Sequence, residues 1–171
     1  MQDVTSTVIP LILAASSALP AAWITLGARD NLLHPDLNET FTAEVVSMAR
    51  MQRDYPESFA RVHHRAIISR SIQSSLFRLM VASEVAVAIA MWLGVLLLLL
   101  ASAGIVPLWM ATLTAAVAMV GFVAIWSAML ICGNHFCYYF AMREPKSRIS
   151  IWSAGAWGTY LCCFFFLDDV A

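Results

Sequence analysis

The chain has 171 residues, of which 61% are hydrophobic and only 12% are charged, and its formal net charge is −1. A soluble domain is typically about 45–50% apolar and about 25% charged, and a chain this small has too little interior to hide so many apolar side chains. These figures exclude an ordinary soluble enzyme domain, a disordered chain and a basic nucleic-acid-binding surface. We therefore expect one integral membrane domain, residues 1–171, with no nucleic-acid partner.

Four segments are apolar over the roughly 20 residues that a membrane-spanning helix requires. The first has no basic residue before its apolar stretch, so we interpret it as a retained helix, although residues 14–22 contain the small residues typical of a signal-peptide cleavage site. The sequence thus predicts an all-α fold, a four-helix transmembrane bundle. Its spans cover approximately residues 5–28, 76–104, 107–133 and 149–167.

One long polar segment, residues 29–75, separates the first two spans. Asn38 is a candidate helix cap, and a helix that starts there ends before Pro56. Between them, side chains recur at helical spacing: Phe41, Val45, Met48 and Gln52. We expect an amphipathic helical segment, with a second helical stretch from about Phe59 leading into the next span. The segment either lies in the membrane interface or packs across the end of the bundle, and both arrangements stay open.

The basic residues predict the orientation, because positively charged loops are enriched on the cytoplasmic side. The N-terminus, residues 102–106 and residues 167–171 hold no Lys or Arg. We therefore expect a multi-pass protein of the bacterial inner (plasma) membrane, with the basic loops in the cytoplasm and both termini outside. Those loops are residues 29–75, with Arg29, Arg50, Arg53, Arg61, Arg65 and Arg70, and residues 142–148, with Arg143, Lys146 and Arg148.

Small side chains let membrane helices approach one another closely. We expect such packing at small residues four positions apart in the second and fourth spans, Ala82, Ala86, Ala90, Ala154 and Gly158. The same pattern would serve contacts within the bundle or with a partner subunit. Aromatic side chains favour the two membrane–water interfaces, and we predict this position for Trp109, Trp152, Tyr138 and Tyr139.

Glu84 is the one charged residue that lies well inside a predicted span. An ionisable group at such a depth is costly and faces protein or water. It is either a structural residue that joins helices by hydrogen bonds or a carboxylate that binds a proton or a ligand. In the predicted topology Arg78, Asn134 and His135 arrive at the same end, and together with Glu84 they form a candidate polar cluster. The neighbouring span ends bring further polar residues there, Arg29, Asn31 and Ser150.

The sequence names no catalytic residue, because it contains no phosphate-binding loop, metalloprotease motif or nucleophile elbow, and we lean against an enzyme. A bis-histidine haem site needs histidines inside the spans, and none lies there. In the predicted topology Cys132 and Cys137 lie far from Cys162 and Cys163, which disfavours a four-thiolate metal site. We predict no metal and no cofactor, with haem or quinone as the alternative, and we expect bound lipid.

Several short stretches of the chain form motif-like elements: Asn31-Leu32 with Asp36, Asn38 and Phe41; Val46-Ser47-Met48 followed by Pro56; Arg65-Ala66-Ile67; and Gly121-Phe122 through Gly133-Asn134-His135-Phe136. Together with Glu84, they resemble the motifs of a known family, the bacterial predicted small integral membrane proteins of domain-of-unknown-function family 2165. This resemblance implies four spans and no established activity. At residues 133–136 that family more often shows Gly-Glu-Trp-Phe, so Asn134 and His135 depart from its pattern and the acid is missing here.

The small size, the lack of a soluble domain and the lack of a catalytic motif favour one functional hypothesis above others. It is a non-catalytic accessory or assembly subunit of a larger membrane complex, respiratory or photosynthetic, with other integral membrane subunits and membrane lipid as partners. Two alternatives remain. One is a small proton-coupled transporter centred on Glu84. The other is a quinone- or haem-anchoring membrane protein that uses His135 and the arginines.

Overall fold

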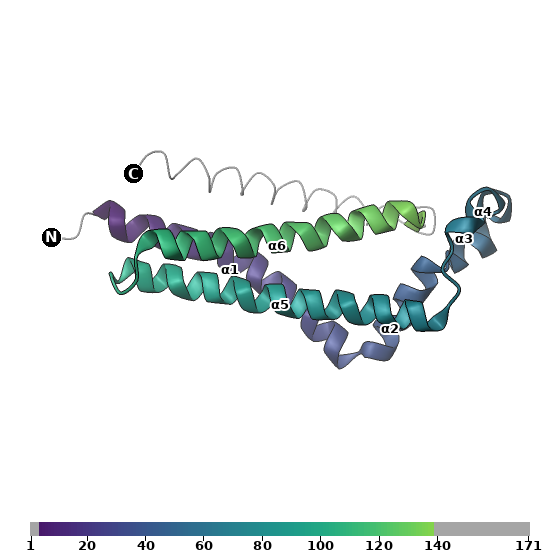
Figure 1. Ribbon diagram of the computed structural model, residues 1–171, viewed down its shortest axis with the longest axis horizontal. Coiled ribbons are helices and arrows are strands. Elements are labelled where there is room, and N and C mark those ends of the chain that lie inside the picture. The colour runs from purple at the N-terminus through teal and green to yellow at the C-terminus, as the bar shows by residue number, and fades with distance from the viewer. Residues whose placement is uncertain (1–3, 139–171) are drawn as a thin grey trace.

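The computed structural model describes residues 4–138, and every regular element in this range is a helix. Three long helices lie side by side, and each runs antiparallel to the next one along the chain (Figure 1): α1 (Val4–Leu33), α5 (Arg70–Ser102) and α6 (Leu108–His135). Shorter helices gather at one end of this rod: α2 (Pro35–Val46), α3 (Ala49–Asp54), α4 (Pro56–Val62) and the 3-10 turn His63–Arg65.

The long helices confirm the first three predicted spans. Within residues 4–138, three helices are long and apolar enough to cross a membrane: Ser6–Leu33, Arg70–Ser102 and Leu108–His135. The predicted fourth span, residues 149–167, lies outside the described residues, so the structure supports an all-α fold with three candidate membrane helices rather than the full four-helix bundle.

The α5 helix is longer than the predicted span because a helix continues where its apolar stretch ends. It begins at Arg70 rather than near residue 76, and it has 33 residues. At 1.5 Å per residue this length is roughly 50 Å, which exceeds the roughly 30 Å of a bilayer's hydrocarbon layer. One end of α5 therefore projects beyond the membrane and carries the short helices.

The core of the bundle lies where α5 packs between α1 and α6. Near the turn between α5 and α6, Leu13 and Ala14 of α1 meet Leu98 of α5 and Ala111 of α6. Further along, a second buried cluster joins the same three helices through Ala21, Ile24, Ala88, Met91, Met119 and Phe122. Since lipid tails are as apolar as these side chains, close packing rather than exclusion of water stabilises such contacts.

Gly94 allows the closest approach of α5 to α6. A Cβ atom added there would lie 2.9 Å from the Cα of Ala115 and 3.2 Å from its Cβ. Both residues are buried, and any side chain at position 94 would press on the backbone of α6. The small residues that bring these two helices together are therefore Gly94 and Ala115.

The alanines predicted to pack lie to one side of the buried face of α5. That face contains Val81, Glu84, Ala88, Met91, Gly94, Val95 and Leu98. Ala90 is half-buried against the second cluster, whereas Ala82 and Ala86 are exposed. Ala154 and Gly158 lie outside the described residues. The exposed alanines leave a smooth surface on α5.

Proline and a left-handed residue set the boundaries of the short helices. Pro35 occupies the first turn of α2 and His34 precedes it, so Asn38 lies inside the helix. The prediction that Asn38 caps the helix is wrong, because proline's fixed φ suits the first helical position better. Met48 has a φ of 56° and separates α2 from α3.

The segment before α5 is extended rather than helical, which corrects the expectation that a helix leads directly into the second span. The 3-10 turn ends at Arg65, and α5 begins only at Arg70. The N–H of Ile67 donates to the carbonyl of Val46 at 2.9 Å, and Gln73 Nε2 donates to the carbonyl of Ile67 at 2.7 Å. These two hydrogen bonds tie the extended segment to α2 and α5.

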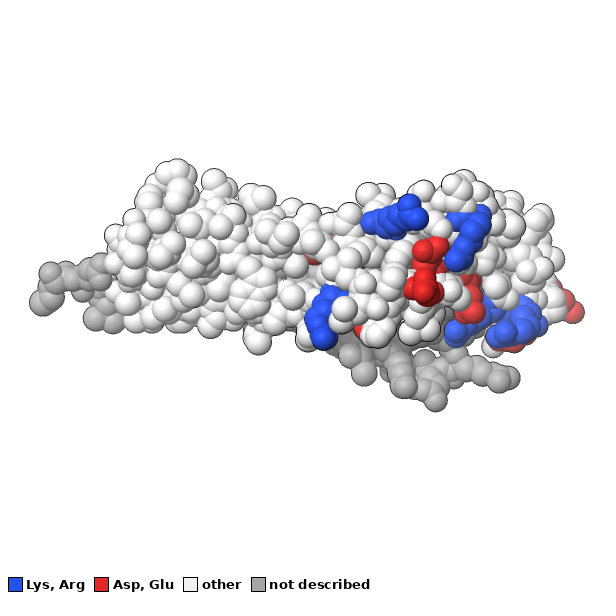
Figure 2. All heavy atoms as spheres, turned by 90° about the horizontal axis from the view of Figure 1, so that it is seen from below, with Lys and Arg blue, Asp and Glu red and all other residues white. Residues whose placement is uncertain are grey.

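The short helices pack across the end of the bundle, which is one of the two arrangements left open by the sequence. Val46, Met48 and Met51 form a buried cluster with Phe136, the residue that follows α6. On the face shown in Figure 2, charged side chains gather at this end, whereas the opposite part of the rod is free of them. The charged end thus lies outside the hydrocarbon layer.

Candidate functional site

Glu84 lies on the buried face of α5 and is joined to α1 by a hydrogen bond. Its side chain is only 7% exposed. Asn31 Nδ2, near the end of α1, donates to Glu84 Oε2 at 2.7 Å. Buried polar groups in a membrane protein need such partners, because lipid offers none. Asn31 therefore holds one carboxylate oxygen in place.

The distance of Glu84 from the end of α5 indicates the depth at which a bilayer would hold it. Roughly 27 Å of helix separate it from Ser102, where α5 ends. A hydrocarbon layer of about 30 Å that starts at the Ser102 end would place Glu84 just inside its other boundary. A molecule that reaches Glu84 can therefore come from the headgroup region as well as from the bilayer.

A cavity of about 430 Å³ opens beside Glu84, between α1, α2, α5 and α6. Glu84, Asn31, Asn38 and Thr42 bring polar groups to its wall. Most of the wall is apolar, with four aromatic rings and two methionines: Phe41, Trp126, Phe136, Tyr138, Met80 and Met129. A cavity of this size with a few polar groups has the features of a binding site for a small molecule.

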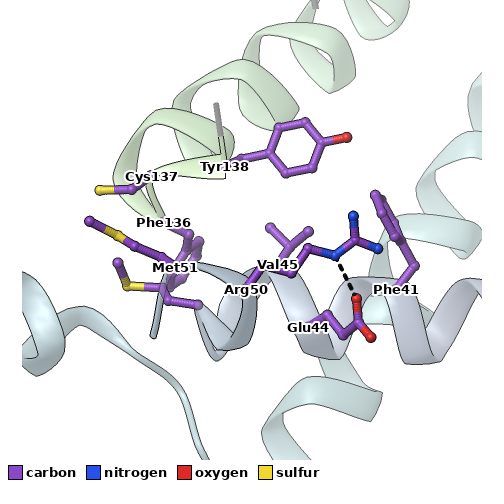
Figure 3. A pocket seen from close by; sticks show the side chains of 9 residues that line it. Phe41, Glu44, Val45, Arg50, Met51, Phe136, Cys137 and Tyr138 are labelled. Carbon is purple, nitrogen blue, oxygen red and sulfur yellow. Dashed lines mark hydrogen bonds and ion pairs between the residues drawn. The ribbon is translucent and has the colours of Figure 1, made fainter. Parts of the chain in front are cut away.

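The aromatic wall of the cavity continues into a smaller hollow of about 20 Å³ between α2, α3 and the end of α6 (Figure 3). The rings of Phe41 and Tyr138 meet edge to face, with their centroids 6.0 Å apart. The guanidinium of Arg50 lies 5.8 Å from the centroid of the Phe41 ring and pairs with Glu44 at 3.0 Å. These contacts hold the rings of Phe41 and Tyr138 at the cavity wall.

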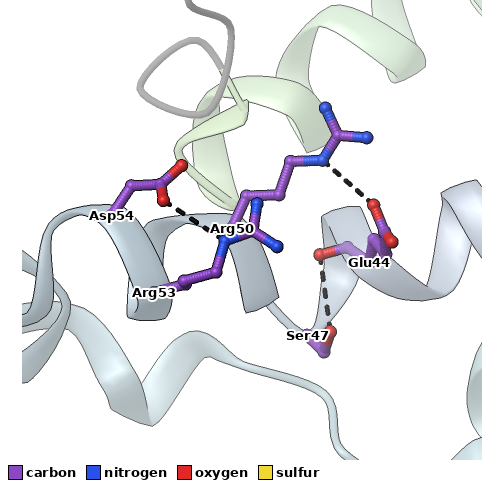
Figure 4. A network of polar contacts seen from close by, with 5 residues as sticks. All are labelled: Glu44, Ser47, Arg50, Arg53 and Asp54. Carbon is purple, nitrogen blue, oxygen red and sulfur yellow. Dashed lines mark hydrogen bonds and ion pairs between the residues drawn. The ribbon is translucent and has the colours of Figure 1, made fainter.

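Two sets of polar contacts fix α2, one to α3 and one to α5. At the α2–α3 break, Arg50 pairs with Glu44 and Ser47 Oγ donates to the Glu44 carbonyl, while Arg53 pairs with Asp54 within α3 (Figure 4). Both ion pairs are largely exposed, and such pairs contribute little to stability. The second set is shielded more: Glu39 accepts from Ser74 at 2.5 Å and pairs with Arg70 at 3.3 Å.

The structure places the predicted polar cluster at one end of the bundle, but it joins Glu84 to a different residue. Arg78, Asn134 and His135 are exposed. Among the described residues, no hydrogen bond or ion pair links them to Glu84, whose partner is Asn31. The backbone carbonyl of His135 accepts from Arg65 Nη1 at 3.5 Å. Ser150 lies outside the described residues.

The predicted interface aromatics take two different positions. Trp109, in the first turn of α6, is 67% exposed at the end of the rod away from the charged residues, a position that suits a membrane interface. Tyr138 instead packs against Phe41 at the cavity. Tyr139 and Trp152 lie outside the described residues.

The histidines and cysteines of the described residues are dispersed. Within residues 4–138, no group of three or more His, Cys, Asp or Glu side chains could hold a metal ion. His63 and His64 lie together in the 3-10 turn, with ring centroids 6.2 Å apart, and the ring of His135 meets that of Phe136 edge to face. Cys132 lines the cavity and is free, as is Cys137.

Sequence reasoning missed most of the cavity wall. Trp126, Met129, Leu130 and Gly133 share one face of α6, and their three- and four-residue spacing was the available signal. The contribution of Asn38 and Phe41 depends on α2 continuing along α5 beyond the end of α1, which no local pattern predicts.

The sequence model of the predicted small integral membrane protein family, DUF2165, matches residues 9–156. The chain belongs to this family. No curated protein and no solved structure matches the chain at a significant level. The DUF2165 match covers all of α2 to α6 and nearly all of α1, and so includes every residue described at the cavity.

Seven of the residues that carry the resemblance to DUF2165 line the cavity, and they come from α1, α2, α5, α6 and the position after α6. They are Asn31, Asn38, Phe41, Val46, Glu84, Gly133 and Phe136. The two residues that depart from the family's motif, Asn134 and His135, are exposed and do not line the cavity. Other motif residues, such as Leu32, Asp36 and Arg65, do not line it either, so only part of the resemblance falls on this cavity.

Proposed function

We propose that the protein binds a small amphipathic molecule in the cavity beside Glu84, and that it acts as a membrane-embedded carrier or transporter for that molecule. The observation that carries this proposal is a buried carboxylate, fixed by Asn31, in the wall of an otherwise apolar cavity of about 430 Å³. Ligand cavities in proteins commonly range from about 300 to 1,000 Å³.

The chemistry of the wall defines the ligand class. The Glu84 carboxylate accepts a hydrogen bond or attracts a cation, and once protonated it donates one. The aromatic faces of Phe41, Trp126 and Tyr138 suit a flat ring or an organic cation. A lipophilic cation and a quinone both meet this description, which extends the proton-coupled and quinone-binding alternatives drawn from the sequence.

Calorimetric titration of the purified protein tests the proposal with two probes, tetraphenylphosphonium as the lipophilic cation and decylubiquinone as the neutral quinone. We expect at least one probe to bind. Glu84→Gln, which keeps the shape of the side chain and removes its charge, should weaken binding of the cation at least ten-fold, about 1.4 kcal/mol. The quinone only accepts hydrogen bonds, so the Gln amide can still donate to it.

A second variant tests the cavity itself. Gly133 lines the cavity, and a Cβ there meets only ordinary contacts at 3.8 Å and beyond. Gly133→Leu should therefore narrow the cavity and weaken binding while the protein still folds. Glu57→Gln, an exposed position on α4, is the matched control and should bind as the wild type does. The proposal fails if neither probe binds, or if both cavity variants bind normally.

A specific observation also favours the accessory-subunit hypothesis. Ala82 and Ala86 on α5 and Ala124 and Ala128 on α6 are exposed at four-residue spacing. Small residues at this spacing let another membrane helix approach closely. Native mass measurement in mild detergent tests this second candidate: a partner subunit should co-purify with the wild type and be lost from Ala82→Leu with Ala86→Leu. A lone wild-type chain would contradict it.

The orientation remains part of the proposal. The charged end of the rod carries α3 and α4, whose arginines favour the cytoplasmic side of a bacterial inner membrane. In that orientation the cavity lies near the cytoplasmic boundary of the membrane, and its ligand enters from that leaflet or from the cytoplasm.

A further inference from the structure

A second hollow lies between α1 and α5 and shares no residue with the Glu84 cavity. It is a groove of about 390 Å³, and its wall is almost entirely apolar. Ala28 and Leu32 of α1 line one side, and Val85 and Ile89 of α5 line the other. Leu32 and Ile89 are 60% and 65% exposed, so the groove opens to the surroundings of these two membrane helices.

A hydrogen bond satisfies the polar groups in the wall of this groove. Trp92 Nε1 donates to Thr25 Oγ1 at 3.0 Å, and Thr25 Oγ1 itself donates to the carbonyl of Ala21 at 2.6 Å. The indole N–H and the hydroxyl therefore need no hydrogen bond from a ligand. The remaining surface of these two side chains in the groove is apolar, which suits a hydrocarbon chain.

Arg29 brings a positive charge to the groove. It is exposed, and no carboxylate among the described residues pairs with it. It is also the first charged residue of α1 after the apolar stretch, so its long side chain can reach the headgroup region from within the helix. Arg78, a second exposed arginine with no carboxylate partner among the residues that the structure describes, lies two turns before Val85 on the same face of α5.

We propose that this groove binds one anionic phospholipid, with an acyl chain between α1 and α5 and its phosphate group on Arg29. The apolar wall matches the chain, the unpaired guanidinium matches the phosphate, and the opening faces the bilayer in which such lipids reside. One basic residue near an anionic headgroup contributes roughly a five-fold preference, about 1 kcal/mol.

Brominated lipids test the proposal, because bromine on an acyl chain quenches tryptophan fluorescence on contact. The protein is placed in phosphatidylcholine vesicles that contain a small fraction of brominated phosphatidylglycerol or, in parallel, of brominated phosphatidylcholine. Subtracting the signal of Trp92→Phe isolates Trp92, which lines the groove. We expect the anionic lipid to quench Trp92 at roughly one-fifth of the concentration that the neutral lipid needs.

Three variants define the outcome. Arg29→Gln should remove the difference between the two lipids, whereas Arg61→Gln, an exposed arginine on α4, should keep it. Ile89→Phe narrows the groove without adding a second indole, and it should reduce quenching of Trp92 by both lipids. Equal quenching by the two lipids in the wild type would overturn the proposal, and so would a preference that survives Arg29→Gln.

Discussion

Asn31 and Glu84 form a hydrogen bond of 2.7 Å that joins the end of α1 to α5 at the wall of the large cavity. The two residues are 53 positions apart, and the intervening chain forms α2, α3 and α4. The contact thus both closes a long loop and orients the carboxylate. Its loss should affect stability as well as ligand binding.

Asn31→Leu should lower stability by roughly 1–2 kcal/mol, because the buried carboxylate of Glu84 loses its donor. Thermal unfolding of the detergent-purified protein measures this change. Asn134→Leu is the matched control, since Asn134 is exposed at the end of α6. Equal unfolding temperatures for the two variants would contradict the structural role of Asn31.

Gly94→Ala should destabilise the bundle by about 1–3 kcal/mol, because the added Cβ lies 2.9 Å from the Cα of Ala115 and forces α5 away from α6. Gly27→Ala is the control, since a Cβ there has nothing within 4 Å. It should be neutral or slightly stabilising, because alanine favours a helix more than glycine does. Equal thermal stability of the two variants would contradict the close approach of the helices.

Glu39→Gln should loosen α2 from α5, because Glu39 both accepts from Ser74 and pairs with Arg70. We expect faster hydrogen exchange of backbone amides in α2, with little change in α1 and α6. Glu44→Gln removes a more exposed pair, that with Arg50, and should change exchange far less. A larger increase in exchange for Glu44→Gln than for Glu39→Gln would contradict the role of Glu39 in holding α2 against α5.

Single cysteines test the proposed orientation in a variant whose four native cysteines are replaced by alanine. Ser58→Cys on α4 and Ala103→Cys at the α5–α6 turn are both exposed and lie at opposite ends of the rod. A membrane-impermeant maleimide added to intact cells should label position 103 and leave position 58 unlabelled. The reverse pattern would invert the orientation, and labelling of both would contradict the spanning arrangement.

The sequence predicted the long helices well, because the length of an apolar stretch alone decides whether a helix can span a membrane. It also singled out Glu84, since a lone charge among apolar residues is conspicuous, and it placed Asn31 at the same end from the order of the spans. These inferences need only composition and chain order. They do not need the rotation of each helix about its axis.

The rotation of each helix about its axis explains where the structure differs from the predictions made from the sequence. Ala82 and Ala86 have the spacing of a packing face, yet Gly94 turns another face of α5 toward α6. Several faces of an apolar helix look alike in sequence, and only contacts with its neighbours decide among them. The cavity wall was hidden for a related reason, since it depends on α2 lying along α5, where Glu39 contacts Ser74 and Arg70.

The length of α5 has a consequence for the bilayer around the protein. A helix of roughly 50 Å overshoots a hydrocarbon layer of about 30 Å, so a thicker or thinner membrane leaves the bundle itself unchanged. What changes is the surroundings of Glu84, which lies roughly 27 Å from the far end of that helix. A bilayer only a few ångströms thinner would bring its carboxylate among the headgroups, and a thicker one would bury it in the hydrocarbon layer. Membrane thickness would therefore control how far the Glu84 carboxylate is exposed to water and headgroups.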